Sequence, residues 1–415
     1  MKRLLLLLVL IIIAAIDLGC ARFAYVENQF GYNNLRQPYV RVRIMETSAV
    51  SISCSGPYEL FCTLPTGEKT DYYSNSEVRA FLRDGRIAVD ERSGLPLESG
   101  LKGVVAVPAS AEDHLILDGK AFRGVADIIL ESDSLSVVNA VYMEDYLKGV
   151  LPPEIGKHGR SELEALKAQA VASRTYALSR FKRNPGRAYD MVNQVADQLY
   201  IGMSIEDKWI NRAIEQTRGE VLMVGGDLIT AYYHSTCGGA TENIEDVWEK
   251  QARSYLKGKD DGHFCSWSKF YDWEYRWNAS NLARFIETYL RNKGRFNGDS
   301  LLLDSLKVID RLPSGRIRIL KVFGRGMEFL LFKDQIRWAL LRPDKPGAIL
   351  PSTLFELFME RDANGRLSAV TAKGHGNGHG VGMCQCGALG RSRAGAHYRE
   401  ILKHYYSNID IKSVY

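Results

Sequence analysis

The sequence feature that most constrains this chain is a helical pattern that runs from residue 161 to residue 181. An α-helix turns by about 100° per residue, so apolar side chains at the right spacing gather on one face and pack against a core. The positions that fall together here are Leu163, Leu166, Ala170, Ala177 and Phe181. Ser161, followed three residues later by Glu164, predicts a capping box at the start. We therefore expect a long buried helix.

A charged side chain interrupts the apolar face of this helix. Arg174 projects from the middle of the face, and Lys167 lies at its edge, about 20° away around the helix axis. Removing a guanidinium from water costs several kcal/mol unless an anion or a ligand compensates for the lost hydration. Arg174 should therefore meet either a carboxylate in a structural salt bridge or the contents of a binding site.

A Pro-Pro-Glu sequence precedes the helix at Pro152, Pro153 and Glu154. Two consecutive prolines hold the backbone extended and remove two amide donors. The pattern predicts a stiff loop that presents the side chain of Glu154, although a solvated surface glutamate after a Pro-Pro turn would have the same sequence.

The N-terminus has the pattern of a signal peptide. Lys2 and Arg3 precede an apolar run from Leu4 to Ile16, which is shorter than the ~20 residues of a spanning helix. Residues 1–20 are therefore expected to be a signal peptide or lipoprotein signal, and the protein to be exported. Cys20 hints at lipidation, but Asp17 sits where such sites usually carry leucine, so lipidation, ordinary cleavage and a retained anchor all stay open.

The charge balance limits the classes of partner. Basic residues slightly outnumber acidic ones, 54 to 49, for a formal net charge of +5. This mild excess gives no reason to expect nucleic acid as a partner, and it is compatible with an anionic polymer of the cell envelope.

Strand-like and helical runs together predict an α+β fold. Short β-like runs, beginning with Tyr39 to Ile44 and Val50 to Ser53, predict a small β-rich N-terminal accessory domain at residues 21–100. Residues 101–415 are expected to form a mixed, β-rich core domain with the long buried helix. Within it, a helix around residues 282–290 and a hairpin turning at residues 324–326 suggest an inserted subdomain at about 275–370.

Two glycine-rich segments carry histidines and cysteines. The first, HSTCGGATE, starts at His234 and combines the hydroxyl of Ser235 with Gly238 and Gly239, whose backbone can approach a ligand closely. A tight turn that needs small residues is the alternative. The second, GHGNGHGVGMCQCGALG at 374–390, contains His379 and predicts a loop lying close against another part of the chain.

The cysteines admit two kinds of cross-link. Six soft ligands occur in three close pairs, which would suffice for a tetrahedral zinc site, although no spacing matches a standard finger. These are His234, Cys237, His263, Cys265, Cys384 and Cys386. In an exported protein, disulfides are the favoured alternative to zinc. Cys54 and Cys62 could likewise close a disulfide or remain buried thiols.

Several of these segments resemble one known family. EALKAQAVASRTYA, from Glu164 to Ala177, resembles the signature EALKAQAVAARTYA of the stage II sporulation protein D / LytB (SpoIID/LytB amidase-enhancer) family of exported, sporulation-related peptidoglycan-acting proteins. The likeness continues in VVNAVYMEDYLKGVLPPE before the helix, and in QLYIG, HSTCGGATENIEDVW, GHGVGMCQCGALG and EILKHYYSNIDI after it. It says little about the first hundred residues.

The resemblance implies that residues 101–415 are a catalytic domain that cleaves peptidoglycan glycan strands lytically. In such a reaction one acid protonates the glycosidic oxygen and the muramic acid 6-hydroxyl attacks, giving a 1,6-anhydromuramyl product. Glu154 matches the family's catalytic glutamate and would act as the single general acid/base. A cation directly beside it would lower its pKa, so we expect Arg174 to be offset from it. The expected substrate-binding residues are Arg174, Lys167, Tyr200, His234, Ser235, Gly238, Gly239 and His379, with Trp248 as a further wall or a core residue.

The cysteine pair at Cys384 and Cys386 departs from the family, which usually has serine and tyrosine there. This paired departure suggests that both cysteines partner Cys237 and Cys265. No cofactor is required by the lytic mechanism, and zinc stays open.

Three functions therefore compete. The first is a lytic transglycosylase acting on glycan strands stripped of stem peptides. The second is a noncatalytic, glycan-binding enhancer of an N-acetylmuramoyl-L-alanine amidase, and the third is a zinc hydrolase that uses His234 and the cysteines. In each case we expect a cell-envelope protein that contacts a membrane only through an N-terminal signal or lipid anchor.

Overall fold

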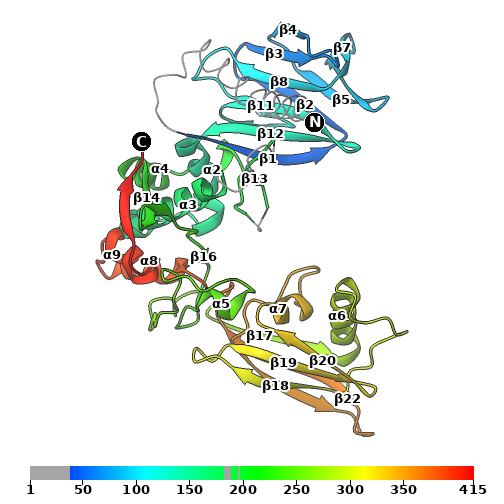
Figure 1. The fold of residues 1–415 in the computed structure, drawn as a ribbon, viewed down its shortest axis with the longest axis vertical. Coiled ribbons are helices and arrows are strands. Elements are labelled where there is room, and N and C mark those ends of the chain that lie inside the picture. The colour runs from blue at the N-terminus through cyan, green and yellow to red at the C-terminus, as the bar shows by residue number, and fades with distance from the viewer. Residues whose placement is uncertain (1–37, 182–187, 195–196) are drawn as a thin grey trace, which may run out of the picture. The chain divides into compact units, whose positions relative to one another are not determined.

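The computed structural model describes residues 38–181, 188–194 and 197–415 (Figure 1). The predicted signal sequence at 1–20 lies outside the described residues. The chain divides into two compact units, the first holding residues 38–159, 173–221 and 412–415 and the second residues 160–172 and 222–411. Strand accounts for 39% of the structure and helix for 23%, which confirms the predicted β-rich α+β class.

Two sheets make up most of the first unit. The seven-stranded sheet has the order β13-β1-β12-β11-β8-β3-β4, and the six-stranded sheet has the order β10-β9-β2-β5-β6-β7. Their strands are β1 (Tyr39–Thr47), β2 (Ala49–Cys54), β3 (Tyr58–Thr63), β4 (Lys69–Ser74), β5 (Val78–Arg83), β6 (Arg86–Glu91), β7 (Pro96–Leu101), β8 (Gly103–Pro108), β9 (Leu115–Leu117), β10 (Lys120–Phe122), β11 (Val125–Glu131), β12 (Ser134–Tyr142) and β13 (Met191–Val192).

The register of these sheets places apolar side chains in the core. β12 pairs antiparallel with both β1 and β11, and its residues from Leu135 to Tyr142 are all buried, as expected for a strand covered on both faces. The strands predicted at 39–44 and 50–53 are confirmed as β1 and β2. Strands on both sides of residue 100 share each sheet, so the fold shows no division at that point. Cys54 and Cys62, which lie in different sheets, are free thiols.

Helices follow the last long strand of the first unit. β12 leads directly into α2 (Met143–Ile155), and α3 (Leu163–Phe181) is the helix that the apolar pattern predicts. The predicted capping box is wrong. Ser161 lies in a short 3-10 turn, η2 (Arg160–Glu162), where its hydroxyl bonds to Glu162. η2 and the start of α3 belong to the second unit, whereas η3 (Met203–Ile205) and α4 (Lys208–Gln216) belong to the first.

The second unit contains two three-stranded antiparallel sheets, β17-β22-β21 and β18-β19-β20, that share one apolar core with two helices. The strands are β17 (Asp272–Asn278), β18 (Ser305–Arg311), β19 (Ile317–Gly324), β20 (Met327–Phe332), β21 (Phe355–Arg361) and β22 (Leu367–His375), and the helices are α6 (Ala279–Asn292) and α7 (Gln335–Ala339). The predicted hairpin at 324–326 joins β19 to β20, and the predicted helix is α6.

Short elements carry the glycine-rich segments. A hairpin turn at Gly225 and Gly226 joins β14 (Glu220–Val224) to β15 (Asp227–Leu228), and both glycines have positive φ. β16 (Tyr233–His234) pairs in parallel with β23 (Met383–Cys384), which brings the two segments together. The other elements are α5 (Ile244–Val247), α8 (Gln385–Arg393), α9 (Tyr398–Tyr405) and β24 (Asp410–Ser413).

The loop predicted at 374–390 ends earlier than expected, because residues 385–393 form helix α8. Two glycines inside this helix have a packing reason. A Cβ on Gly387 would lie 2.1 Å from an oxygen of Asp261, and a Cβ on Gly390 would lie 2.1 Å from the carbonyl oxygen of Phe264. The many glycines of this segment therefore serve two purposes: some belong to the loop, and others let Asp261 and Phe264 lie close against helix α8.

Candidate functional site

The Pro-Pro-Glu sequence forms the last turn of α2 instead of the predicted loop. Because proline has no amide hydrogen, Pro153 cannot bond to the carbonyl of Gly149 four residues earlier. That carbonyl instead accepts the amide of Ile201 at 3.3 Å. The two prolines therefore do not break the helix, and they free a carbonyl that holds the segment 198–202 against its C-terminal end.

Glu154 lies half-buried in this last turn. Its Oε1 accepts the amide of Leu199 at 3.0 Å, from the segment that the freed carbonyl also holds. Burial raises the pKa of Glu154 to about 7, and the Leu199 hydrogen bond opposes that rise. Within the described part of the chain, no cation forms an ion pair with this carboxyl. Glu154 can therefore be protonated near neutral pH.

Tyr200, expected to line a cleft, is a core residue. Its side chain is 2% exposed, and its hydroxyl donates to Asn139 Oδ1 at 3.0 Å. The ring packs in a tilted arrangement against that of Tyr146, with ring centres 5.1 Å apart. Gly149 leaves room for it, because a Cβ there would lie 2.6 Å from the Tyr200 ring. Tyr200 supports the position of the Leu199 amide and has no face for a substrate.

Arg174 has the structural partner that its burial requires. It is fully buried and forms a bidentate ion pair with Glu144, with Nη2 to Oε2 at 2.6 Å and Nε to Oε1 at 3.0 Å. Its Nη1 donates to the carbonyl of Glu220 at 3.0 Å. Glu144 Oε1 also accepts the Gly219 amide and the hydroxyl of Tyr415. The geometry therefore supports a structural salt bridge and not a substrate-binding role, since no surface of Arg174 is left for a substrate.

Lys167, in the part of α3 that belongs to the second unit, is also engaged. Its ammonium donates to Glu164 Oε1 at 2.6 Å and lies 5.7 Å from the centre of the Tyr398 ring. Glu164 in turn accepts the amide of Tyr398 at 2.9 Å. This i,i+3 pair holds α9 near the start of α3, which is a packing role.

His234 and His379 lie together in the second unit, with ring centres 5.5 Å apart. Burial lowers the pKa of His234, with His379 as a further cause, and burial together with Arg337 and Arg316 lowers the pKa of His379 to about 3. Both imidazoles are therefore neutral near pH 7. The Nδ1 of His234 contacts the carbonyl of Val381 at 3.2 Å, while its buried Nε2 has no partner among the described residues.

An aromatic group that we call the aromatic cluster extends from His379. It consists of Tyr232, Trp248 and His379, whose rings lie 4.8 to 6.2 Å apart. All three side chains are half-buried, so part of each ring reaches solvent. The exposed Lys250 lies 4.9 Å from the Trp248 ring centre and bonds to the Tyr232 hydroxyl.

The turn after His234 faces the cysteines. Ser235 has a half-exposed side chain whose hydroxyl bonds to Thr236 at 3.3 Å. Gly238 and Gly239 both have positive φ, and a Cβ on Gly238 would lie 3.1 to 3.2 Å from Leu354 and His375. The Gly239 amide donates to Cys237 Sγ at 3.4 Å. The glycines thus allow a tight turn around a sulfur atom.

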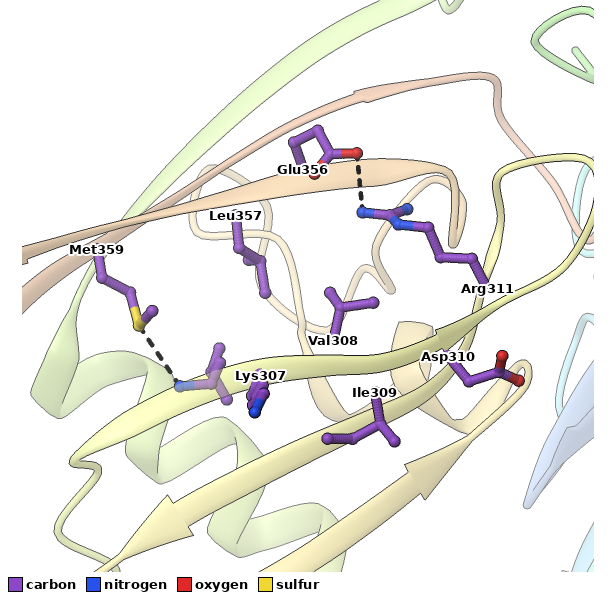
Figure 2. A pocket seen from close by; sticks show the side chains of 9 residues that line it. Lys307, Val308, Ile309, Asp310, Arg311, Glu356, Leu357 and Met359 are labelled. Carbon is purple, nitrogen blue, oxygen red and sulfur yellow. Dashed lines mark hydrogen bonds and ion pairs between the residues drawn. The ribbon is translucent and has the colours of Figure 1, made fainter.

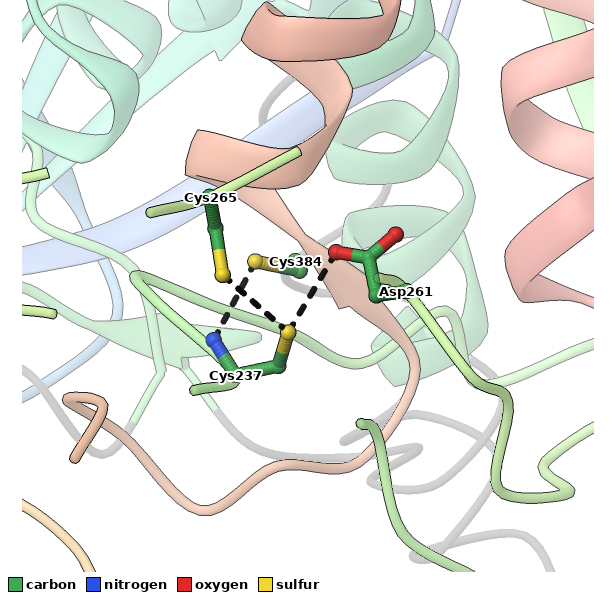
Figure 3. A group of neighbouring side chains, drawn as sticks. All are labelled: Cys237, Asp261, Cys265 and Cys384. Carbon is green, nitrogen blue, oxygen red and sulfur yellow. Dashed lines mark hydrogen bonds between the residues drawn. The ribbon is translucent and has the colours of Figure 1, made fainter. Parts of the chain in front are cut away.

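Three of the predicted cysteines gather with an acidic residue that the sequence pattern missed. Cys237, Cys265, Cys384 and Asp261 are buried, and their ligand atoms all lie within 4.8 Å of one another (Figure 3). His234 and Cys386 are not part of this group. Cys386 instead accepts a hydrogen bond from Thr236 Oγ1 at 3.4 Å. Asp261 lies four residues before Cys265, and that spacing was the available signal.

A separate hollow of about 530 Å³ lies between β18 and β21 in the second unit (Figure 2). Both carboxylates in its lining are engaged by arginines, Glu356 by Arg311 at 2.8 Å and Asp310 by Arg318. Neither is free to transfer a proton to a ligand. This hollow therefore lacks the unpaired acid found at Glu154.

Two family models match the chain. One described as stage II sporulation protein matches residues 131–224, a range that includes Glu154 and α3. Another, described as a domain of unknown function, matches residues 260–382 and covers the region in which we expect an inserted subdomain. Within the described residues, no helix has the length and apolarity needed to cross a membrane.

Relatives match over longer spans. An uncharacterised protein of Brachyspira hyodysenteriae is 29% identical over 386 residues, 92% of this chain and 94% of that protein. The amidase enhancer of Bacillus subtilis is 29% identical over 336 residues, 73% of this chain but 46% of the enhancer. Stage II sporulation protein D of Bacillus subtilis is 25% identical over 377 residues, 87% of this chain and 94% of that protein. The resemblance indicated by the motifs is thereby confirmed, and the chain is a relative of stage II sporulation protein D and the amidase enhancer, with a stage II sporulation protein domain at residues 131–224.

Proposed function

We propose that the protein is an exported lytic transglycosylase that cleaves peptidoglycan glycan strands to 1,6-anhydromuramyl products. Glu154 donates a proton to the glycosidic oxygen and, as the resulting carboxylate, accepts the proton of the muramic acid 6-hydroxyl when that oxygen attacks the anomeric carbon. The observation that carries the proposal is an acid with a pKa of about 7 to which no cation of the described residues is paired.

The surroundings of Glu154 favour a lytic reaction over hydrolysis. A hydrolase needs a second carboxylate to activate water or to form a covalent intermediate. Burial and the Leu199 amide are the causes that set the pKa of Glu154, and no carboxylate among the described residues contributes to it. A single acid with a pKa near the working pH is sufficient when the nucleophile belongs to the substrate.

The aromatic cluster is our candidate for the sugar-binding surface of the second unit. Aromatic rings suit the apolar faces of sugar rings, and Trp248, Tyr232 and His379 each have part of a ring exposed. Because His379 is neutral, the exposed ammonium of Lys250 provides the cluster's positive charge. We assign to Lys250, instead of Arg174 or Lys167, the recognition of a muramic acid carboxylate.

The relatives support a location in the cell envelope and an amidase as partner. One of them is named for enhancing an amidase, and an amidase that strips stem peptides would prepare the glycan that this chain cleaves. No cofactor is needed for the proton transfers that we assign to Glu154.

The test is incubation of the purified protein with peptide-free glycan strands, followed by mass spectrometry of the product ends. We expect 1,6-anhydromuramyl ends with the natural chain and none with Glu154→Gln. Glu215→Gln, at an exposed position on α4 in the same unit, is the matched control and should retain activity. Reducing ends that carry solvent oxygen would identify a hydrolase and contradict the proposal.

The alternative is a noncatalytic enhancer of an amidase, which the name of the Bacillus subtilis relative favours. In that case Glu154→Gln should leave stimulation of the amidase on intact peptidoglycan unchanged, whereas Trp248→Ala should reduce both glycan binding and stimulation. Measuring stem-peptide release with each variant separates the two functions.

A further inference from the structure

The group of Cys237, Asp261, Cys265 and Cys384 has no part in the proposed glycan chemistry. All four residues belong to the second unit and are at most 1% exposed. They come from three separate segments, namely the turn after β16, the stretch 261–265, and the boundary between β23 and α8. Figure 3 shows the three sulfur atoms and one Asp261 oxygen pointing toward one another.

We propose that these four side chains hold one zinc ion in a closed, structural site. Zinc binds thiolates at about 2.3 Å and carboxylate oxygens at about 2.0–2.2 Å, so tetrahedral ligands lie roughly 3.5 Å apart. The Cys237 and Cys265 sulfurs are 3.4 Å apart, and Cys237 Sγ lies 3.3 Å from Asp261 Oδ2. Binding displaces the thiol protons to solvent and leaves three thiolates and one carboxylate on the ion.

Asp261 is oriented as a ligand by its other oxygen. Its Oδ1 accepts the Tyr405 hydroxyl at 2.8 Å and Nη2 of Arg391 at 3.0 Å, which leaves Oδ2 directed at the sulfurs. Outer partners of this kind fix the direction of a ligating carboxylate. Glycine is required at position 387 for helix α8 to approach Asp261, because a Cβ there would lie 2.1 Å from Oδ2.

Backbone amides donate hydrogen bonds to the sulfur atoms. Cys384 Sγ accepts the amides of Cys237 and Gly387, both at 3.2 Å, and Cys237 Sγ accepts the amide of Gly239 at 3.4 Å. Such bonds stabilise thiolates, the form in which cysteine binds metal. The glycine-rich turn and the start of α8 therefore supply an outer shell for the sulfurs.

A buried arginine lies beside the group. Arg316 is 1% exposed and donates from Nη2 to the carbonyl of Cys237 at 2.7 Å. Among the residues that the structure covers, it forms no ion pair with a carboxylate, and its Nε has no partner. The carboxylates of Glu242 and Asp334 act on this guanidinium from a longer distance. Zinc with three thiolates and one carboxylate has a formal charge of −2, which would add to their compensation of Arg316.

The composition of the group favours a metal over a disulfide. One disulfide would use two of the three sulfurs and leave a buried thiol beside Asp261, whereas a tetrahedral ion uses all four side chains. With four protein ligands, no position remains for water, so the site is structural. A zinc hydrolase that uses His234 would need this histidine among the ligands, and the proposed site does not include it.

The test is metal analysis of the reduced full-length chain together with its cobalt(II) spectrum. We expect about one zinc per chain. In Cys384→Ser the zinc should be absent, or its affinity should fall at least tenfold. Cys386→Ser, two residues further on, is the matched control and should keep full occupancy. Cobalt(II) added to the unaltered chain should give intense visible bands of tetrahedral cobalt and thiolate charge transfer, a readout that does not depend on a variant folding.

Three results would overturn the proposal. The first is absence of metal after the reduced chain has been incubated with zinc, and the second is a cobalt spectrum with only weak octahedral bands. The third is a disulfide between Cys237 and Cys265 in the native chain, seen as a mass lower by two hydrogens and as a cross-linked peptide. Glu154→Gln should keep its zinc while losing glycan cleavage, so failure of the metal site and failure of the proposed function are told apart.

Discussion

Helix α2 carries one glutamate in its first turn and another in its last turn, and the two have opposite surroundings. Glu144 in the first turn is 2% exposed, and its two oxygens accept two bonds from Arg174, one from the Gly219 amide and one from the Tyr415 hydroxyl. Glu154 in the last turn is half-buried and, among the residues with a described position, accepts one bond, from the Leu199 amide. The same residue type on the same helix is thus held as a paired anion at one end and left uncompensated at the other.

This difference separates a structural carboxylate from a chemical one. A buried anion that is fully paired contributes to the fold only while its partners remain. Burial disfavours the charged form of a carboxylic acid, and when no cation offsets this effect the pKa is raised. Such an acid can give and take a proton near neutral pH. The four predictions below test the contrast, from the largest expected effect to the smallest.

The largest effect should come from Glu154→Gln on glycan cleavage. Removing a general acid typically costs about 10² to 10⁴ in rate. In the natural enzyme the rate should fall about tenfold per pH unit above the pKa of about 7, because only protonated Glu154 donates. The measurement is the rate of anhydromuramyl product formation between pH 5 and pH 9. A rate that rises steadily through pH 8 would rule out Glu154 as the proton donor.

Arg174→Met should destabilise the first unit by about 3 to 5 kcal/mol, since it leaves the Glu144 charge buried without its cation. Urea unfolding followed by circular dichroism would measure the shift in midpoint. The double variant Arg174→Met with Glu144→Leu removes both charges and should recover part of that loss. A single variant within about 0.5 kcal/mol of the natural chain would show that the ion pair is dispensable.

Tyr415→Phe removes one hydrogen bond to Glu144 while keeping the ring. Hydrogen bonds to charged groups contribute about 1.5 to 3 kcal/mol, so we expect a loss at the lower end of that range, because three other bonds to the carboxylate remain. The same unfolding assay measures it. Tyr73→Phe, at a position 63% exposed in β4, is the control and should change little.

The helix and strand pattern could be predicted from sequence because each element obeys a local rule. The apolar face of α3, the strands β1 and β2, and the glycine turn between β14 and β15 all follow from side-chain spacing or positive φ. Glu154 was identified as the acid from its match to a family motif, and its pKa and lack of a cation are consistent with that assignment.

Long-range contacts explain what the sequence did not predict. The prolines at 152 and 153 stay within α2 because the freed carbonyl of Gly149 bonds to an amide 52 residues away. Arg174 has a carboxylate partner 30 residues earlier in the chain, whose identity no helix pattern could supply. Asp261 joined the cysteines for the same reason, since only the fold brings it to Cys237.

The smallest effect tests the contrast most directly, through the stability of Glu154→Gln. The pKa of this side chain is about 7 in the folded state against an ordinary value of 4.5, so between these pH values the folded chain binds a proton that the unfolded chain does not. Stability should therefore decrease as pH rises from about 4.5 to 7, and the penalty should be complete above pH 7.

Glutamine cannot ionise, so Glu154→Gln should match the natural chain near pH 4 and exceed it above pH 7. The gain should be about 1 to 2 kcal/mol, after discounting the shift for a half-exposed side chain. Glu144→Gln, the same substitution at the other end of α2, should destabilise at pH 8 because it removes the anion facing Arg174. Thermal melts of both variants at pH 4 and pH 8 would measure the difference. If both substitutions destabilised the chain at pH 8, Glu154 would be a structural carboxylate like Glu144.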